Sequence, residues 1–262
     1  MDGQYQQENK AYWDNRAAGY SQVNQTELDT EQHQIWRNEL VCQIGKIFPQ
    51  KLPEETNILE VGTGPGFFAI ILAEAGYRIT AVDYTPAMLN QAQANAGKLA
   101  GKIAFLEMDA EALQFEDHCF DVVVSRNLTW NLPNPEQAYK EWIRVLAPGG
   151  LLLNFDANWY AYLFDPAERA AYEQDRRNTA QAHIKDEYLC TEIDVMERLA
   201  RKAPLSCIKR PDWDIGLLAS LGMGQIQADF QVWQRVWSEQ EKINFHATPM
   251  FLVSAVAKDI SL

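Results

Sequence analysis

A glycine-rich turn next to acidic residues is the part of this chain whose residue types and spacing predict chemistry. The glycines are Gly62, Gly64 and Gly66. Glu60 lies just before them, and Asp83 follows roughly twenty residues later, where an acid accepts the hydroxyls of a ribose. Glycines allow the main chain to approach a ligand closely, and the N–H groups that open the next helix receive a carboxylate or sugar oxygens. A carboxylate beside the turn disfavours a pyrophosphate and suits a ligand with an ammonium and a sulfonium group.

A nicotinamide dinucleotide is the first alternative ligand for this turn. The dinucleotide fingerprint G-x-G-x-x-G needs its third glycine at position 67, where this chain has Phe67. Both Phe67 and Glu60 therefore count against an NAD-dependent oxidoreductase, which would share the same order of strands and helices.

The run E-V-G-T-G-P-G at residues 60–66 resembles motif I of the class I S-adenosylmethionine (SAM)-dependent methyltransferases. The stretch Y-W-D-N-R-A-A-G-Y at residues 12–20 resembles the F-W-D-x-x-A-x-x-Y opening of the ubiquinone/menaquinone-biosynthesis-type branch (methyltransferase domain 11/25-like). The resemblance covers about residues 10 to 160 well and the remainder loosely. It implies S-adenosyl-L-methionine as the cofactor and in-line transfer of its methyl group to an acceptor.

The resemblance assigns roles to residues at the strand ends. Asp83 is expected at the ribose, Asp109 at the adenine amino group, and the Ala110 N–H at a ring nitrogen. Main-chain contacts are expected from Arg126, whereas Tyr84 and Met88 either pack near the adenosine or belong to the core. The expected cofactor-binding residues are Tyr12, Trp13, Tyr20, Glu60, Gly62, Thr63, Gly64, Gly66, Asp83, Tyr84, Met88, Asp109, Ala110, Arg126 and Asn127.

The N-terminal aromatic residues have two interpretations. A spacing of three and four places Trp13, Arg16, Ala17 and Tyr20 near one helical face. The aromatic residues Tyr12, Trp13 and Tyr20 either serve as the packing face of an amphipathic helix or close over the cofactor, because aromatic faces attract cations such as a sulfonium. For Tyr20 the second interpretation is favoured.

The acceptor side is less defined by the sequence. Residues 129–131, Thr-Trp-Asn, stand where many relatives carry histidines, so the acceptor atom is left open between oxygen, nitrogen, sulfur and carbon. A general base is needed only for a nucleophile that arrives protonated. The candidate bases are Asp156, His183 and His246. The candidate substrate-pocket residues are Trp130, Trp159 and Tyr160, with Tyr162 close to them in sequence.

Strand and helix patterns alternate five times and predict an α/β fold with a parallel sheet covered by helices on both faces. We expect strands at residues 57–61, 78–83, 103–108, 120–125 and 151–155, and helices at 30–48, 67–75, 85–99 and 135–146. A helix at 216–221 and strands at 225–237 and 250–258 follow. The resemblance implies a Rossmann-like, doubly wound seven-stranded sheet, mostly parallel with the last strand antiparallel.

We expect residues 1–262 to form a single methyltransferase domain. Residues 1–50 are expected to be an N-terminal helical cap, 51–158 the SAM-binding core, and 211–262 the completion of the sheet. The segment 159–210 exceeds a simple connection and has helical patterns at 167–182 and 191–202. It is either a solvated helical decoration or a lid over the substrate, and the lid is favoured.

Composition limits the class of partner. Acidic residues outnumber basic ones 36 to 23, for a formal net charge of −13, which disfavours nucleic acid and with it an RNA methyltransferase. The scattered cysteines, Cys42, Cys119, Cys190 and Cys207, predict reduced thiols and no metal site.

We expect a cytoplasmic protein without a membrane span, because no apolar run approaches roughly 20 residues and the N-terminus lacks a signal-peptide core. The expected partner is a small-molecule methyl acceptor, and the oligomeric state is open. The alternative is a SAM-binding sensor or scaffold without transferase activity.

Overall fold

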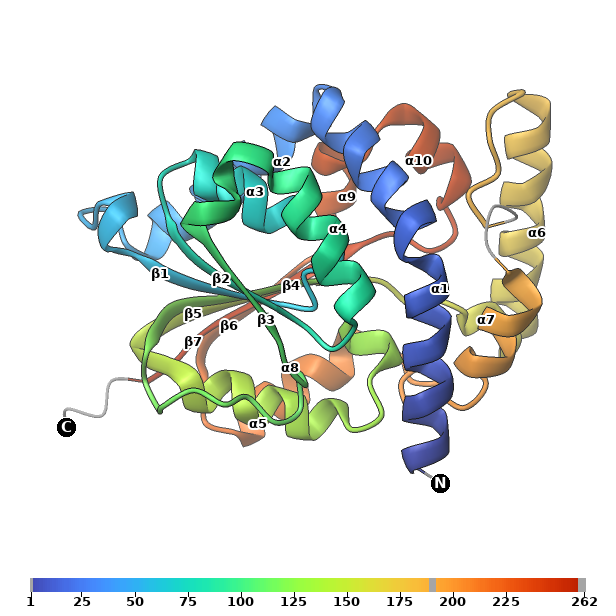
Figure 1. Cartoon of the computed structure of the whole chain (residues 1–262). Coiled ribbons are helices and arrows are strands. Elements are labelled where there is room, and N and C mark those ends of the chain that lie inside the picture. The colour runs from blue at the N-terminus through green and yellow to red at the C-terminus, as the bar shows by residue number, and fades with distance from the viewer. Residues whose placement is uncertain (1, 189–191, 259–262) are drawn as a thin grey trace.

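A seven-stranded sheet forms the middle layer of the computed structural model, which describes residues 2–188 and 192–258 (Figure 1). The strand order is β3-β2-β1-β4-β5-β7-β6, and β7 is antiparallel to both of its neighbours while the other pairs are parallel. This confirms the predicted Rossmann-like fold with its last strand antiparallel. The strands are β1 (Asn57–Val61), β2 (Arg78–Asp83), β3 (Ile103–Glu107), β4 (Phe120–Arg126), β5 (Leu146–Asp156), β6 (Gly224–Asp229) and β7 (Phe251–Val256).

Helices cover both faces of the sheet, with α2, α3, α4 and α9 on one face and α5 and α8 on the other (Figure 1). The helices of these two layers are α2 (Gln32–Ile47), α3 (Phe67–Glu74), α4 (Pro86–Ala96), α5 (Pro135–Val145), α8 (Asp212–Ser220) and α9 (Val232–Val236). Short 3-10 helices at Pro53–Glu55, Gly97–Lys102, Thr129–Asn131 and Ala161–Leu163 lie in the connections.

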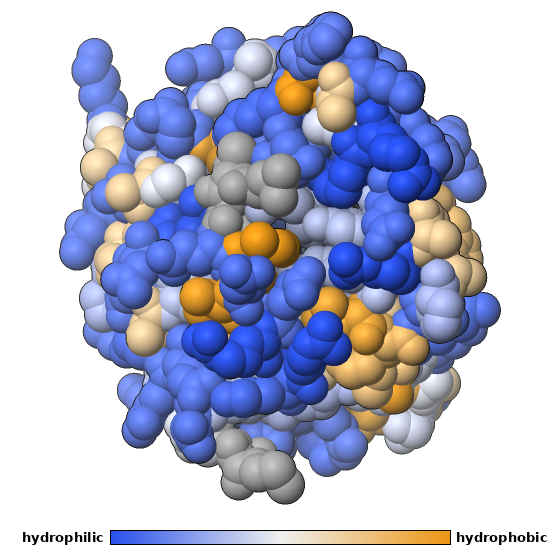
Figure 2. Space-filling model, turned by 90° about the vertical axis from the view of Figure 1, so that its right-hand side faces the viewer, coloured by the Kyte–Doolittle hydropathy of each residue, from blue (hydrophilic) through white to orange (hydrophobic). Residues whose placement is uncertain are grey.

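The remaining helices lie beside the sheet, around its carboxyl edge (Figure 1). They are α1 (Asp2–Asp29), α6 (Pro166–Gln181), α7 (Ile193–Ala200) and α10 (Glu239–Asn244). The face that this side presents to solvent is mainly hydrophilic, with smaller apolar areas between the polar side chains (Figure 2). Within the described ranges no helix combines the length and apolar character needed to cross a bilayer.

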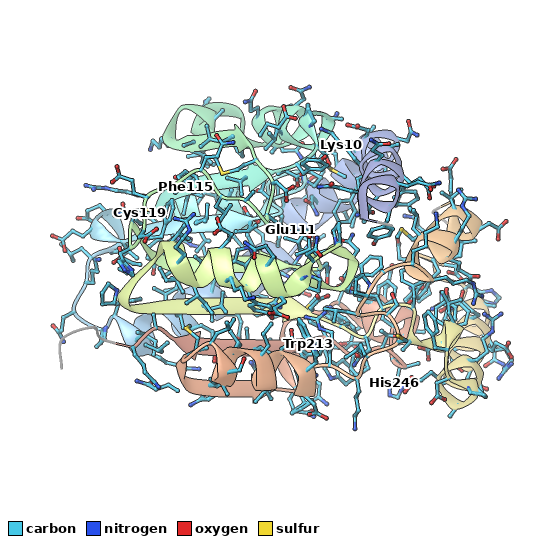
Figure 3. All side chains as sticks on the ribbon, turned by 90° about the horizontal axis from the view of Figure 1, so that it is seen from below. Lys10, Glu111, Phe115, Cys119, Trp213 and His246 are labelled. Carbon is cyan, nitrogen blue, oxygen red and sulfur yellow. The ribbon has the colours of Figure 1, made fainter. Side chains whose placement is uncertain are left out.

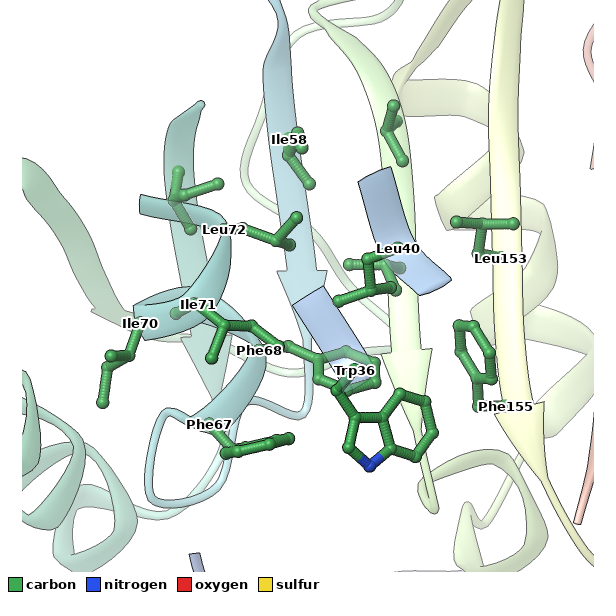
Figure 4. Close-up of a cluster of buried hydrophobic side chains, with 14 of the residues drawn as sticks. Trp36, Leu40, Ile58, Phe67, Phe68, Ile70, Ile71, Leu72, Leu153 and Phe155 are labelled. Carbon is green, nitrogen blue, oxygen red and sulfur yellow. The ribbon is translucent and has the colours of Figure 1, made fainter. Parts of the chain in front are cut away.

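The core on the α2–α3 face fixes the glycine turn between β1 and α3. Trp36 of α2 packs against Phe68 of α3 and Phe155 of β5, with ring centroids 5.0 and 5.3 Å apart (Figure 4). All three rings are buried, as is Leu40 one helical turn after Trp36. Since burial of each such side chain stabilises the fold by about 1.5–3 kcal/mol, α3 is held firmly on the sheet and its N-terminus stays at the end of β1.

The expectation of one strand over residues 225–237 is wrong in its second half. β6 ends at Asp229, whose Oδ1 accepts a hydrogen bond from the Gln231 N–H at 2.8 Å, and α9 follows. Val232 and Val236 are both fully buried, a spacing of four that suits one face of a helix. The aromatic and β-branched residues of this segment imitate a strand composition, but their burial follows the helical period.

The insertion after β5 contains two helices, α6 and α7, in agreement with the predicted patterns. Thr191, where the second pattern was expected to begin, lies outside the described residues, as does Cys190. α4 begins at Pro86, and within the described residues the side chain of Thr85 before it accepts no capping hydrogen bond. The Thr85 N–H donates to Oδ1 of Asp83 at 2.8 Å, which fixes the turn between β2 and α4.

Candidate active site

A cavity of about 740 Å³ lies at the carboxyl edge of the sheet, between the ends of the parallel strands and α1. Small-molecule sites in proteins have volumes of roughly 300–1,000 Å³, so this volume suits a nucleoside together with a second small molecule. The cavity is lined by every sequence-predicted cofactor residue except Gly66, and by Trp130, Trp159 and Tyr160 of the predicted substrate pocket.

Gly66 is not among the described residues that line the cavity, and its conformation gives it a structural role. Its φ of +91° lies in the left-handed region, where residues with a Cβ are strained. A Cβ placed on Gly66 would also lie 3.0 Å from the Cβ of Ala92 in α4. The third glycine of the turn therefore permits the close packing of α3 and α4.

Glu60 is a buried acid, the last residue but one of β1, and it lines the cavity. Its Oε2 accepts a hydrogen bond from the Thr63 hydroxyl at 2.6 Å, and its side chain forms no ion pair within the described part of the chain. Burial raises the pKa of Glu60 to about 8, against the opposing effects of Thr63, the Ala69 N–H and the charge of Arg126. A carboxyl group in this state favours a cationic ligand, because a nearby positive charge stabilises its ionised form.

Asp83 connects the end of β2 with the glycine turn. Its Oδ2 accepts the Gly64 N–H at 2.9 Å and its Oδ1 accepts the Thr85 N–H. Burial raises the pKa of Asp83, while these two N–H groups act to lower it. The two hydrogen bonds hold the carboxylate rigidly, and each of its oxygens keeps a further lone pair with the capacity to accept a hydrogen bond.

Asp109 lies two residues beyond β3 and is held from two sides. Its Oδ1 accepts the Glu111 N–H at 2.9 Å, and its Oδ2 accepts Nε2 of Gln6 at 3.0 Å. The second contact ties α1 to the strand ends. Ala110, next in sequence, lines the same end of the cavity and is buried.

The aromatic side chains of α1 face the cavity as a connected group. Tyr12 and Trp13 meet edge to face with ring centroids 5.2 Å apart, and Trp13 and Tyr20 are tilted with centroids 5.8 Å apart. The ring of Tyr20 lies against the glycine turn, 3.6 Å from the position a Cβ of Gly64 would take. These rings pack against one another and also line the cavity, so closure over a cofactor stays a prediction.

Arg126, at the end of β4, acts through its side chain in addition to any main-chain contact expected from sequence. Its guanidinium donates to both carboxylate oxygens of Glu27 at 2.8 and 2.9 Å. It also stacks over the rings of Phe67 and Trp36, 4.8 and 5.3 Å from their centroids. Sequence reasoning missed Glu27, because an acid within a polar helix normally indicates a solvated face.

A second missed carboxyl group is Glu241 in α10. Its Oε2 accepts Nε2 of Gln32 at 2.5 Å, and the N–H and hydroxyl of Ser238 at 2.8 and 2.9 Å. Ser238 and Glu241 also form a capping box at the start of α10. The signal was present in the sequence as S-E-Q-E at residues 238–241, a pattern that predicts a helix start but not a cavity.

The predicted substrate aromatics divide into two groups. Trp130 and Tyr160 line the cavity with ring centroids 5.1 Å apart, and Trp159 lines it beside Phe245, at 5.5 Å edge to face. Tyr162 instead stacks on Tyr172 at 4.0 Å, in a cluster that joins the insertion to the rest of the molecule.

None of the three candidate bases is among the described residues that line the cavity. Asp156 is fully buried, and its Oδ2 accepts hydrogen bonds from Arg210 at 2.5 Å and from the Trp130 N–H at 3.0 Å. His183 and His246 are exposed, and His246 lies at the periphery of the molecule (Figure 3). The geometry thus favours a positioning role for Asp156, which holds the loop of Trp130.

The described cysteines do not contribute to the site. Cys42, Cys119 and Cys207 are free and exposed. Burial acts to raise the pKa of the Cys119 thiol, and Cys119 lies at the opposite end of the molecule from α1 (Figure 3). The described ranges contain no group of His, Cys, Asp or Glu side chains that would hold a metal ion.

Comparison with known proteins adds to this geometry. Residues 59–154 match the family described as "Methyltransferase domain". The chain is 31% identical over 159 residues to a ubiquinone/menaquinone biosynthesis C-methyltransferase UbiE of Bartonella tribocorum, which covers 57% of this chain and 59% of that protein. It is 39% identical over 106 residues to a demethylmenaquinone methyltransferase of Thermus thermophilus, covering 40% of this chain and 47% of the relative. An uncharacterized methyltransferase of Mycobacterium leprae is 36% identical over 96 residues, 37% of this chain and 35% of the relative.

The similarity thus spans only about a third to three fifths of the length of these curated relatives. Among solved structures, that of a putative S-adenosyl-L-methionine-dependent methyltransferase from Methanococcus maripaludis superposes with a TM-score of 0.59. It is 17% identical and covers 95% of this chain and 94% of that one. At this identity the similarity concerns the fold.

Proposed function

We propose that this chain methylates a small molecule, and the match of residues 59–154 to the methyltransferase domain family, in line with the resemblance to the class I SAM-dependent enzymes, supports the proposal. S-Adenosyl-L-methionine is the proposed methyl donor, and the acceptor is a small molecule that shares the cavity with it. Two of the curated relatives are named as methyltransferases of ubiquinone or menaquinone biosynthesis, which supports a small-molecule acceptor.

One observation carries the proposal. The three acids at the ends of β1, β2 and β3, Glu60, Asp83 and Asp109, line one continuous cavity together with the glycine turn. Ligands of open parallel sheets bind at this edge. A pyrophosphate would meet three carboxylates there, so a dinucleotide is disfavoured.

The polar groups of the cavity fit the tail of this donor. Glu60 offers a buried carboxyl that forms no ion pair with any residue in 2–188 or 192–258, which suits an ammonium group. The indole N–H of Trp36 is buried, lines the cavity and lacks a hydrogen-bond partner within the described residues, which suits a carboxylate. In Figure 4 this nitrogen is on the side of the ring away from Leu40. Both side chains neighbour Arg126.

The other residues are assigned by the chemistry of the remaining parts of the donor. Asp83 accepts the ribose hydroxyls, and Asp109 with the Ala110 N–H receives the adenine edge. Tyr20 and Trp13 present aromatic faces to the sulfonium, whose positive charge such faces attract. When bound, the donor supplies an already activated methyl group.

The protein's own contribution to the reaction is orientation and exclusion of water. Alignment of two bound reactants lowers a barrier by roughly 7–11 kcal/mol in favourable cases. Here α1 closes the cavity from outside and is tied down by Tyr5, whose hydroxyl donates to the Asn131 carbonyl at 2.7 Å, and by Gln6 at Asp109. We assign no general base to His183 or His246, because both are exposed.

The segment 159–210 is proposed to act as a substrate lid, with 1–50 as a cap, 51–158 as the SAM-binding core and 211–262 completing a single domain. Trp159 and Tyr160 at the start of this segment, and Tyr188 and Met196 within it, line the cavity. The excess of acidic residues supports a small-molecule acceptor over nucleic acid.

Turnover tests the function directly. The purified chain is incubated with SAM and a panel of small metabolites, and S-adenosylhomocysteine is measured. We expect acceptor-dependent product from the wild type, and for Asp83→Ala a loss of SAM affinity of about 1–3 kcal/mol because buried polar partners are left unpaired. Asp212→Ala is the control, since Asp212 is 68% exposed and remote from the cavity lining. Binding of SAM without turnover on any acceptor would favour the sensor or scaffold.

A further inference from the structure

The cavity extends past the proposed donor site into a part that we call the acceptor chamber. It lies over the ends of β4 and β5 and at the start of β7, and it is lined by Glu27, Arg126, Trp159, Trp237, Glu241 and Phe245. Two of its carboxylates face a single guanidinium. Arg126 is paired with Glu27 through two hydrogen bonds, and among the residues that the structure describes no cation forms an ion pair with Glu241.

Glu241 is held in a fixed orientation. All three of its hydrogen bonds from Gln32 and Ser238 go to Oε2, and within the described part of the chain Oε1 accepts none. Burial raises the pKa of Glu241, and the negative charge of Glu27 raises it further. A positively charged ligand beside Oε1 would lower the pKa of Glu241 again, since an opposite charge favours the ionised carboxylate.

Aromatic rings line the cavity together with Glu241, and Phe245 lies one helical turn after it, with its N–H donating to the Glu241 carbonyl at 2.8 Å. Phe245 contacts Trp237 and Trp159, with ring centroids 5.7 and 5.5 Å apart, and all three line the cavity. Aromatic faces combined with a carboxylate are the side chains that recognise an ammonium group. An anionic acceptor is disfavoured in this chamber, because Arg126 is already committed to Glu27 and the pair Lys185–Glu187, 3.2 Å apart, adds no net charge. The other basic residues that line the cavity, Lys10 and Arg16, belong to α1, where Lys10 pairs with Glu107 and Arg16 lies beside Gly19.

We propose that the acceptor is a primary or secondary amine, bound as its ammonium ion with Glu241 and the surrounding aromatic rings, and methylated on nitrogen. This inference rests on the proposed function. The ammonium gives one N–H proton to Glu241 and becomes a neutral amine. Its nitrogen lone pair then forms the N–C bond to the methyl group as the S–C bond breaks. The electron pair of that bond stays on sulfur, which becomes a neutral thioether, and the positive charge passes to the methylated nitrogen.

The test uses three ligands that share a phenol ring and differ in their head group: tyramine with an ammonium, tyrosol with a hydroxyl and para-hydroxyphenylacetate with a carboxylate. Each is titrated calorimetrically into the full chain saturated with S-adenosylhomocysteine, and each is assayed for turnover with SAM. We expect tyramine to bind about tenfold more tightly than tyrosol, and the carboxylate to bind most weakly.

Glu241→Gln keeps the size of the side chain and removes its charge. We expect this variant to lose the tenfold preference for tyramine while its affinity for S-adenosylhomocysteine is unchanged. Glu239→Gln is the matched control from the same helix, since Glu239 is 86% exposed and pairs with Lys242. It should behave as the wild type does.

The outcomes separate the two proposals. If S-adenosylhomocysteine binds but tyramine does not bind, or binds no more tightly than tyrosol, the amine assignment is overturned and the methyltransferase assignment stands. The amine assignment is likewise overturned, and the methyltransferase assignment stands, if Glu241→Gln still prefers tyramine to tyrosol. If neither SAM nor S-adenosylhomocysteine binds to the wild type, the proposed function itself fails.

Discussion

Replacing Arg210 by methionine should destabilise the protein strongly, because the arginine lies between two fully buried carboxylates. Arg210 donates to Asp214 at 2.9 and 2.7 Å and to Asp156 at 2.5 Å. Its side chain is 1% exposed, and both partners are 0% exposed. Methionine fills a similar volume but leaves two buried carboxylates without a counter-charge. Breaking a buried ion pair from one side costs about 3–5 kcal/mol, against a total stability of about 5–15 kcal/mol.

The loss of stability in Arg210→Met should depend on pH, in a direction that follows from the pKa of Asp156. Burial raises the pKa of Asp156 above that of the unfolded chain even with Arg210 present, and removal of the guanidinium raises it further. A raised pKa in the folded state means that stability is present at low pH and is lost as pH rises through the folded-state value. The difference in free energy of unfolding between Arg210→Met and the wild type should therefore be smaller at pH 5 than at pH 8.

Urea unfolding followed by circular dichroism measures this difference, with Arg235→Met as the matched control. Arg235 also joins two carboxylates, Glu39 at 2.9 Å and Asp229 at 2.6 Å, but its side chain is 45% exposed. Exposed ion pairs contribute about 0–1 kcal/mol to the free energy of unfolding, so Arg235→Met should lose little stability. Equal losses in the two variants, or a loss below about 1 kcal/mol for Arg210→Met, would refute the argument from burial.

Two further predictions follow from the glycine turn and its neighbours. Because burial raises the pKa of Glu60 to about 8, and a free α-amino group titrates at about 7.7–8.0, SAM affinity measured by calorimetry should rise with pH up to about 8 and fall above it. Glu60→Gln should remove the rise and keep the fall; an unchanged profile would exclude Glu60 as the ammonium partner. Gly66→Ala should destabilise by more than 1 kcal/mol, on the order of the cost of strained backbone, whereas Gly216→Ala should stabilise by about 0.5–1 kcal/mol. A Cβ at Gly216, within α8, meets no atom within 4 Å, so thermal unfolding of the two variants should shift in opposite directions.

Much of the fold was predictable because it follows from patterns of residues that are close together in the sequence. The alternation of buried strands with helices identifies the sheet, and the spacing from the glycine turn to Asp83 identifies the ligand edge. Even there, the strand expected at 225–237 was wrong after Asp229, since composition alone does not separate a buried helix of five residues from a strand. The buried pair Val232 and Val236 spans a single helical turn, which is too short for a helical period to be recognised in the sequence.

The parts of the site that escaped prediction depend on pairs far apart in sequence. Glu27 and Arg126 are separated by 99 positions, and Asp156 and Arg210 by 54. Nothing in the local sequence around such residues indicates a partner. Asp156 was therefore predicted as a base from its place at the end of a strand, whereas the structure surrounds it with an arginine and the N–H of Trp130.

Calorimetric titration of the purified chain with SAM, S-adenosylhomocysteine and NAD tests the central claim most directly. The acids at the ends of β1, β2 and β3 predict micromolar binding of the first two ligands and no heat with NAD. Binding of NAD, or silence of both SAM and S-adenosylhomocysteine, would contradict the assignment of this cavity to a nucleoside with a cationic tail.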